Sequence, residues 1–210
     1  MGQNKAINTE KTRVIKAIEI TIVTSALLST KPINDAWASL TDEGPMSIES
    51  NFIVRSEMLW FFLHMMDKFA FEIGGPEVRA TLLDTVVENA IQGILTASFD
   101  TSHAKKGFDS EEWLNRMASD MLEDYNEAAS DYGSCTSLVD ELPDPSGKRT
   151  IIGKLGARIG RQVDQQYNMN LLILISMTAA DALVKSGLKK QVRKLVAYFA
   201  KVYFYFRETC

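Results

Sequence analysis

The stretch that decides the fold is residues 52–71, FIVRSEMLWFFLHMMDKFAF. Folded as a helix, it presents apolar side chains on nearly every side, and such a helix belongs in the middle of a bundle. Gly74, Gly75 and Pro76 follow and predict its end, because glycine stops a helix and proline suits the first turn of the next one. The sequence therefore predicts a largely buried central helix.

Helical periodicity continues on both sides of this stretch. An apolar stripe predicts a first helix over about 9–28 that ends at 29–32, whereas residues 33–45 fit either a short helix or a turn. Further helices are predicted over 77–97, over 109–132, over 151–186 as one long helix or a pair, and over 188–206. We expect an all-α, single-domain helical bundle of about six or seven helices over 1–210, with a long loop near 133–150 and no β-sheet.

The composition is that of an ordinary globular protein, with 46% hydrophobic and 24% charged residues among 210. The two cysteines, Cys135 and Cys210, are too few for a disulfide framework, and no apolar leader opens the chain, so we expect a cytoplasmic protein. The longest apolar run, 169–184, contains Asp181 and is shorter than the ~20 residues of a membrane span. We expect it to form a helix buried in protein.

Charge is divided unevenly along the chain. Residues 1–143 hold 11 Lys and Arg against 23 Asp and Glu, a balance of −12, and residues 144–210 hold 12 against 4, a balance of +8. Most of the acidic side chains of 109–132 lie on one face of its helix, opposite an apolar stripe. The split indicates either an anionic partner for the basic half or mutual neutralisation of the two halves in the fold.

The central helix carries the most suggestive polar group. Glu57, His64 and Asp67 lie at i, i+7 and i+10, roughly on one face of the helix. An imidazole beside carboxylates can bind a metal or act as a base. The favoured interpretation is structural: Glu57 and Asp67 pair with Arg or Lys side chains, some from the basic C-terminal half, and His64 makes one internal hydrogen bond.

Two further patterns have structural explanations. Asp181 lies four residues before Lys185, an orientation that favours a local ion pair on a helix. Gly153, Gly156 and Gly160 place small residues on one helical face, which lets a neighbouring backbone approach closely. The segment 145–150, PSGKRT, lacks the first glycine and the Ser or Thr of a nucleotide-binding phosphate loop.

The last helix offers the best functional surface. Its apolar stripe is flanked by four cations that are candidates for contacts with an anion: Lys189, Lys190, Arg193 and Lys194. The favoured interpretation is that this basic face is solvated and partly meets the acidic 109–131 helix. Aromatic residues crowd the end of the helix on more than one side, which predicts a homo-oligomer interface there.

Taken together, these patterns favour a non-catalytic binding or regulatory protein of bacterial helical-bundle type that acts as a homo-oligomer. One alternative is a metal- or small-ligand-dependent enzyme or sensor that uses Glu57, His64 and Asp67. A second is association with an anionic membrane or with nucleic acid through the basic C-terminal helix, which is not favoured. The sequence identifies no cofactor, and residues 1–50 contain no basic recognition helix of a DNA-binding regulator.

Overall fold

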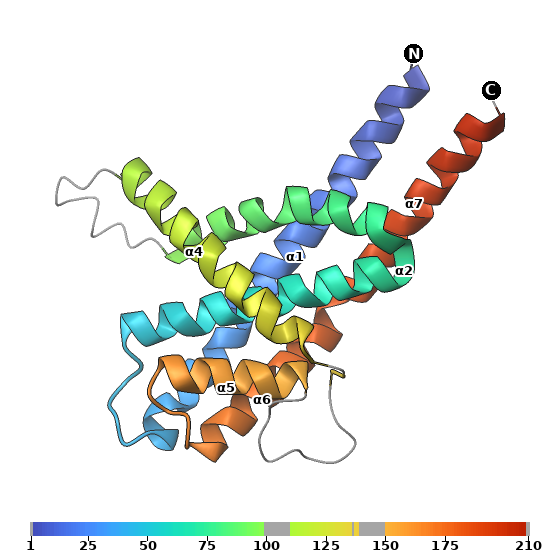
Figure 1. Ribbon diagram of the computed structural model, residues 1–210. Coiled ribbons are helices and arrows are strands. Elements are labelled where there is room, and N and C mark those ends of the chain that lie inside the picture. Colours follow the sequence, from blue (N-terminus) through green and yellow to red (C-terminus); the bar gives the residue numbers. More distant parts are fainter. Residues whose placement is uncertain (1, 99–109, 136, 139–149, 209–210) are drawn as a thin grey trace.

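The computed structural model describes residues 2–98, 110–135, 137–138 and 150–208, with side chains for all of these except 2–8, 113 and 201–208. Its helices are α1 (Gly2–Leu40), α2 (Ile48–Ser98), α4 (Ser110–Gly133), α5 (Ile151–Gln162), α6 (Met169–Ser186) and α7 (Leu188–Glu208) (Figure 1). The described residues form no β-strand, only an isolated bridge between Ser137 and Thr150. The all-α prediction is confirmed. Most of the predicted loop near 133–150 lies outside the described residues, and so do residues 99–107, which join the predicted helices over 77–97 and 109–132.

The first half of α2 is the buried central helix that the sequence predicts. Almost every residue from Val54 to Ala70 is buried, and Trp60, Phe61 and Phe62 are among the largest side chains that are fully enclosed. At Gly75 the backbone has φ 75° and ψ −172°, a conformation that residues with a Cβ rarely adopt. The helix turns sharply there, so α2 is two helices that meet at the predicted stop (Figure 1).

Helix α1 is longer than predicted, because it continues through Pro32 to Leu40. Proline removes the backbone hydrogen bond to the carbonyl of Leu28, but Leu28 and Pro32 are both exposed, so water can satisfy that carbonyl. Beyond the proline, Ile33 and Trp37 are buried against the core. Their packing outweighs the local helix-breaking signal that placed the end of the helix at 29–32.

Helices α6 and α7 together run antiparallel to α1, and α1 begins at the end of the molecule where α7 ends (Figure 1). Three contacts define the register: the Lys11 ammonium over the Phe199 ring, the Gln191 amide donating to Thr21, and the Asn168 amide donating to the Leu40 carbonyl. Gly187, in the left-handed conformation with φ 64°, separates α6 from α7. The predicted helix or pair over 151–186 is a pair, because α5 ends at Gln162 and α6 begins at Met169.

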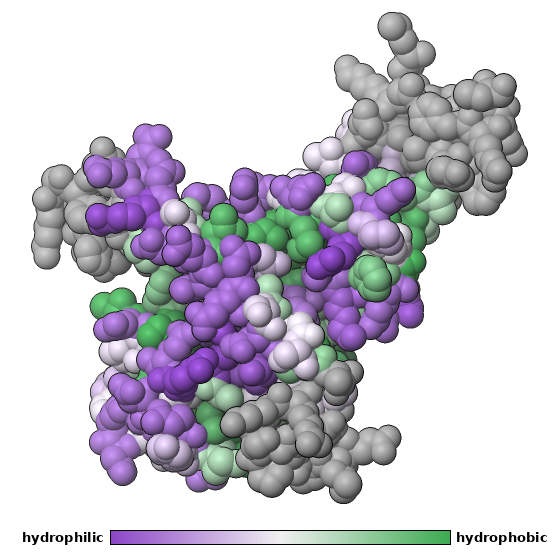
Figure 2. Space-filling model, in the orientation of Figure 1, coloured by the Kyte–Doolittle hydropathy of each residue, from purple (hydrophilic) through white to green (hydrophobic). Residues whose placement is uncertain are grey.

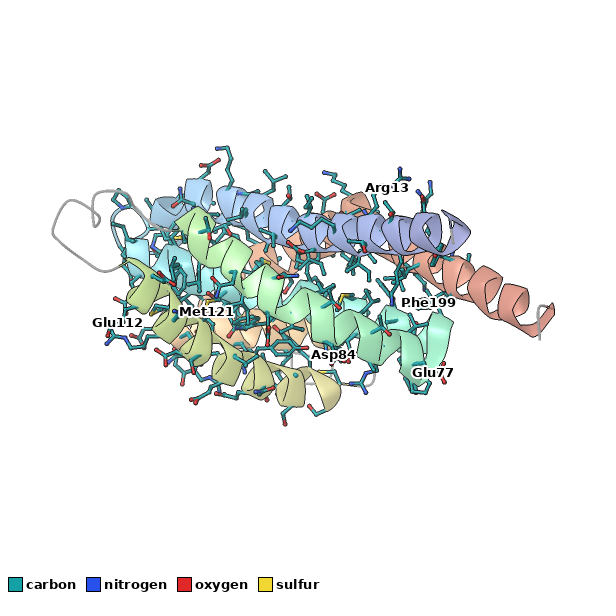
Figure 3. The ribbon with its side chains drawn as sticks, turned by 90° about the horizontal axis from the view of Figure 1, so that it is seen from above. Arg13, Glu77, Asp84, Glu112, Met121 and Phe199 are labelled. Carbon is teal, nitrogen blue, oxygen red and sulfur yellow. The ribbon has the colours of Figure 1, made fainter. Side chains whose placement is uncertain are left out.

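Helix α4 covers α2 on the side opposite α1 (Figure 3). Its predicted apolar stripe points inward, with Met121, Ala128 and Tyr132 buried. Its acidic side chains other than half-buried Asp131 are exposed, and hydrophilic residues cover the band formed by α4 in Figure 2. The amphipathic pattern of this helix therefore predicted its orientation correctly.

Helices α5 and α6 approach each other closely where α5 has glycines. A Cβ built on Gly160 would lie 2.7 Å from Leu172 Cδ2, and one on Gly156 would lie 3.4 Å from the Leu172 carbonyl oxygen. At these two positions the predicted close approach is confirmed. This close packing of α5 on α6 positions α5 so that Arg158 extends into the core.

Candidate functional site

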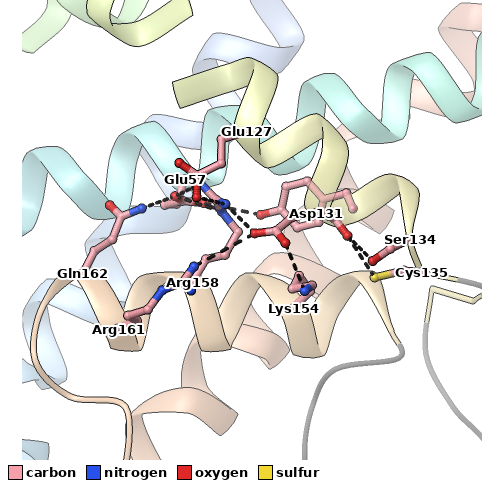
Figure 4. Close-up of polar contacts among 10 residues, drawn as sticks. Glu57, Glu127, Asp131, Ser134, Cys135, Lys154, Arg158, Arg161 and Gln162 are labelled. Atoms are coloured by element: carbon pink, nitrogen blue, oxygen red, sulfur yellow. Dashed lines mark hydrogen bonds and ion pairs between the residues drawn. The ribbon is translucent and has the colours of Figure 1, made fainter. Parts of the chain in front are cut away.

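The most enclosed polar cluster centres on Glu57 of α2 and Arg158 of α5 (Figure 4). Their side chains are 1% and 2% exposed. The Arg158 Nη2 donates to Glu57 Oε1 at 2.8 Å, and Nε donates to Glu57 Oε2 at 2.9 Å. This is a two-point pairing, which fits the planar guanidinium to the carboxylate. Glu57 is thus paired with a cation of the C-terminal half, as the structural interpretation of the sequence predicted.

The same arginine also joins α4 to the cluster. Its Nη1 donates to Asp131 Oδ2 at 2.7 Å, and Lys154 contacts the other oxygen of Asp131 at 3.2 Å. Gln162 donates to Glu57 Oε1 at 2.6 Å, from the end of α5. Arg158 therefore ties three helices together, and the Tyr132 hydroxyl donates to Glu57 Oε2 at 3.5 Å. We call the side chains of Glu57, Asp131, Tyr132, Lys154, Arg158 and Gln162 the core network.

Burial and pairing set the ionisation of the core network. Burial raises the pKa of Glu57 above its usual value, and the hydrogen bonds from Arg158 and Gln162 offset this only in part. Burial also acts to raise the pKa of Asp131, but hydrogen bonds from Arg158 and Lys154 prevail and lower it. Burial acts to lower the pKa of Arg158, but its carboxylate partners together prevail and raise it above its usual value. The arginine therefore stays protonated, and its charge is neutralised locally by acidic partners.

His64 and Asp67 do not join Glu57. The His64 ring packs on the Tyr132 ring with 5.3 Å between centroids, and burial lowers the pKa of His64 against the opposing effect of Asp67. Asp67 accepts two hydrogen bonds from Arg79, one of them from Nη2 at 3.1 Å. Among the described residues, no three His, Cys, Asp or Glu side chains could together hold a metal ion. The described residues therefore contain no ligand set for the metal site that the sequence suggested.

The four predicted anion-contact residues are all exposed on α7, and we call Lys189, Lys190, Arg193 and Lys194 the basic patch. Within the described part of the chain none of them forms an ion pair, although the Lys189 ammonium lies 5.1 Å from the centre of the Phe69 ring. Helix α7 packs on α1 and α2 through Leu188, Val192 and Leu195.

The acidic helix α4 is paired elsewhere. The ion pairs of α4 that the structure describes run to Lys154, Arg158 and Arg161 of α5. The expectation that the basic face of the last helix partly meets the 109–131 helix is therefore wrong for the ion pairs that the structure describes. Within these contacts, the mutual neutralisation of the two halves takes place at α5, and the basic patch has no share in it.

Helix α6 is buried on one side only, which corrects the expectation of a helix buried in protein. Leu171, Ile175, Ala179 and Leu183 face the core, while the opposite side is open to solvent and mainly apolar, with exposed Asn170 and Asp181 among its apolar side chains. The exposed fractions on that side are 55% for Met169, 51% for Ile173, 66% for Met177 and 82% for Val184. We call these four side chains the α6 apolar face. Apolar residues in 169–184 extend beyond the side that packs on the core, and this was the sequence signal for a second apolar surface.

A shallow groove of about 480 Å³ runs between α1 and α6 beside this face. The exposed side chains of Ile20 and Leu28 contribute to its α1 side. Its α6 side includes Asp181 and Lys185, which form the predicted ion pair at 2.7 Å. Most of the other residues that line the groove are Ser or Thr, so the groove is more polar than the α6 apolar face.

One stretch of the described residues, Met169–Ala200, is long and apolar enough for a helix that crosses a membrane, and 22% of its apolar window is buried. Comparisons with protein-family models, with curated proteins and with solved structures found no match for this chain.

Proposed function

We propose that this protein is a non-catalytic binding protein and that the α6 apolar face is its binding surface. The observation that carries the proposal is the exposure of four large apolar side chains along one side of a single helix. A row of exposed large apolar side chains on one side of a helix is typical of an interaction site.

The core network has a structural role where α2, α4 and α5 meet. Glu57 is enclosed and already accepts hydrogen bonds from Arg158 and Gln162, so it has no free lone pair directed at solvent for a substrate. The network instead fixes α2, α4 and α5 relative to one another. A rigid body of this kind holds the outer helices in place for docking.

A second candidate is self-association through the end of α7. Tyr198 and Phe199 are half-buried at the point where α7 passes the beginning of α1, and Lys11 lies over the Phe199 ring at 5.0 Å. The sequence beyond them contains further aromatic residues on several sides of the helix. A second copy of the chain would cover such a surface.

Methionine oxidation tests the first proposal even when the partner is unidentified. Met169 and Met177 are exposed, whereas Met58 and Met66 are fully buried. A brief pulse of hydroxyl radicals, read by mass spectrometry, should oxidise Met169 and Met177 readily in the dilute purified protein. In intact cells that produce the protein, we expect several-fold less oxidation at both positions, while half-buried Met46 serves as the reference.

Substitution of Ile173 by Glu supplies the matched test of specificity. A charge in the middle of the α6 apolar face should restore the oxidation of Met169 and Met177 in cells. Gln92→Glu, at an exposed position on α2, should leave the shielding unchanged. Equal oxidation of Met177 in cells and in dilute solution would show that nothing docks on this face.

A further inference from the structure

We infer that the α6 apolar face and the basic patch form one surface that binds an anionic lipid bilayer, with α6 lying in the plane of the interface. This inference rests on the proposed function and names its partner. The two parts follow one another along the chain, because the apolar face ends at Val184 and the basic patch begins at Lys189 after the Gly187 junction, and α6 and α7 both pack on α1.

The chemistry of the two parts matches the two layers of a bilayer surface. Methionine, isoleucine and valine side chains enter the boundary between headgroups and acyl chains, and lysine and arginine stay with anionic headgroups. Helix α7 contains no Asp or Glu before Glu208, so no carboxylate within that helix opposes the attraction along the basic patch. On α6 the single carboxylate, Asp181, is already paired with Lys185.

Other occupants leave part of this surface unmatched. Nucleic acid would contact the basic patch through its phosphates but would leave the α6 apolar face in water. A second copy of the chain, packed antiparallel through α6, would bring each basic patch toward the partner's α6 N-terminus. That terminus is the positive end of the helix dipole, so the two copies would repel there.

The opposite side of α6 explains why the helix lies on the bilayer and does not cross it. Leu171, Ile175 and Ala179 are fully buried against the rest of the molecule, with α1 and α5 as the neighbouring helices. A spanning arrangement would strip α6 from this core. Interfacial binding uses only the side that is already exposed.

The experiment is flotation of the full chain with lipid vesicles. Vesicles of phosphatidylcholine with 30% phosphatidylglycerol should carry the protein to the top of the gradient, and pure phosphatidylcholine vesicles should carry at least tenfold less. The double variant Ile173→Glu, Met177→Glu should lose binding at least tenfold, and so should the change of all four basic-patch residues to Gln. As the matched control, Arg13, Lys31, Arg116 and Arg161, all exposed elsewhere, are changed to Gln and should alter binding less than twofold.

A fluorescence measurement locates the contact. An environment-sensitive dye on Met177→Cys, in a background with Cys135→Ser and Cys210→Ser, should shift to the blue on anionic vesicles. The same dye on Gln92→Cys should not shift. Circular dichroism of each variant in solution establishes that the helices are retained, and the dye provides a readout that needs no change of charge.

Four results would overturn the inference. The first two are failure of the wild-type chain to float with anionic vesicles and unchanged vesicle binding by the basic-patch variant. The third is binding of duplex DNA without binding of vesicles. The fourth is a dimer in light scattering that does not bind vesicles and that Ile173→Glu dissociates. If Met177 is shielded in cells but vesicles do not bind, the proposed function stands and the lipid partner is wrong. If Met177 is shielded in neither setting, both are wrong.

Discussion

Glu57 and Arg158 are 101 residues apart in sequence and form a two-point ion pair that is almost completely enclosed. Removing one partner leaves the other charge buried and unpaired, which is far more destabilising than the loss of the pair as a whole. The pair is therefore expected to show strong energetic coupling.

Arg158→Met should lower the free energy of unfolding by about 3–5 kcal/mol, because it leaves the Glu57 carboxylate buried without its cation. The double variant Glu57→Met, Arg158→Met should be markedly more stable than the sum of the two single effects predicts. Urea unfolding followed by circular dichroism measures all three variants. The exposed pair of Lys31 and Asp35 is the control, and Lys31→Met should change stability by about 1 kcal/mol or less. Additive effects at Glu57 and Arg158 would contradict the coupling.

His64 should make the stability depend on pH near neutrality. Burial lowers its pKa below the usual value of 6.5, and the charged groups that act on it are Asp67, Lys68 and Arg79. As the pH falls, His64 therefore binds a proton in the unfolded chain at a higher pH than in the folded chain. Its contribution to the free energy of unfolding is fully present above pH 6.5 and is lost as the pH falls toward the folded pKa. In His64→Leu, the loss of stability between pH 7 and pH 5 should be smaller than in the wild type. Urea titrations at each pH measure this, and parallel curves for the two proteins would show that His64 does not titrate differently on folding.

Gly160→Ala should destabilise the contact between α5 and α6 by about 1–3 kcal/mol, since an added methyl group overpacks a closed interface. The new Cβ would lie 2.7 Å from Leu172 Cδ2 and 3.2 Å from the Gln166 Cα, and the backbone cannot easily move away. Gly133→Ala is the matched control, because a Cβ at this last residue of α4 meets nothing within 4 Å. Thermal unfolding distinguishes the two, and an equal effect of both substitutions would rule out the packing explanation.

Truncation after Ala197 tests self-association through the end of α7. If the aromatic end forms the interface of a homo-oligomer, the shortened chain should show a lower mass in light scattering or should fail to fold. Phe199→Ala in the full chain is the milder change and should weaken association while the helices persist. A full-length chain that is monomeric at micromolar concentration would exclude this interface.

Several elements of the fold could be predicted from sequence because their causes are local. The apolar side chains of 52–71 leave no polar side for a surface helix, so this stretch had to be central. Gly75 allows a backbone angle that other residues avoid, so the change of direction followed from the glycine itself. Asp181 and Lys185 are one helical turn apart, and their ion pair needs no other part of the molecule.

Other features required the tertiary structure, because each depends on a choice among several similar surfaces. The sequence indicated a cation for Glu57, but only the packing of α5 against α2 selected Arg158 among the basic residues of the C-terminal half. Helical periodicity could not show which side of 169–184 faces solvent, because apolar residues occur on both sides of this helix. The basic patch is exposed because α7 packs on α1 and α2 through its apolar stripe, while Asp131 of α4 pairs with Lys154 and Arg158 of α5. Helical periodicity reports the few residues within one or two turns, whereas the pairing of distant faces is decided by the packing of the whole chain.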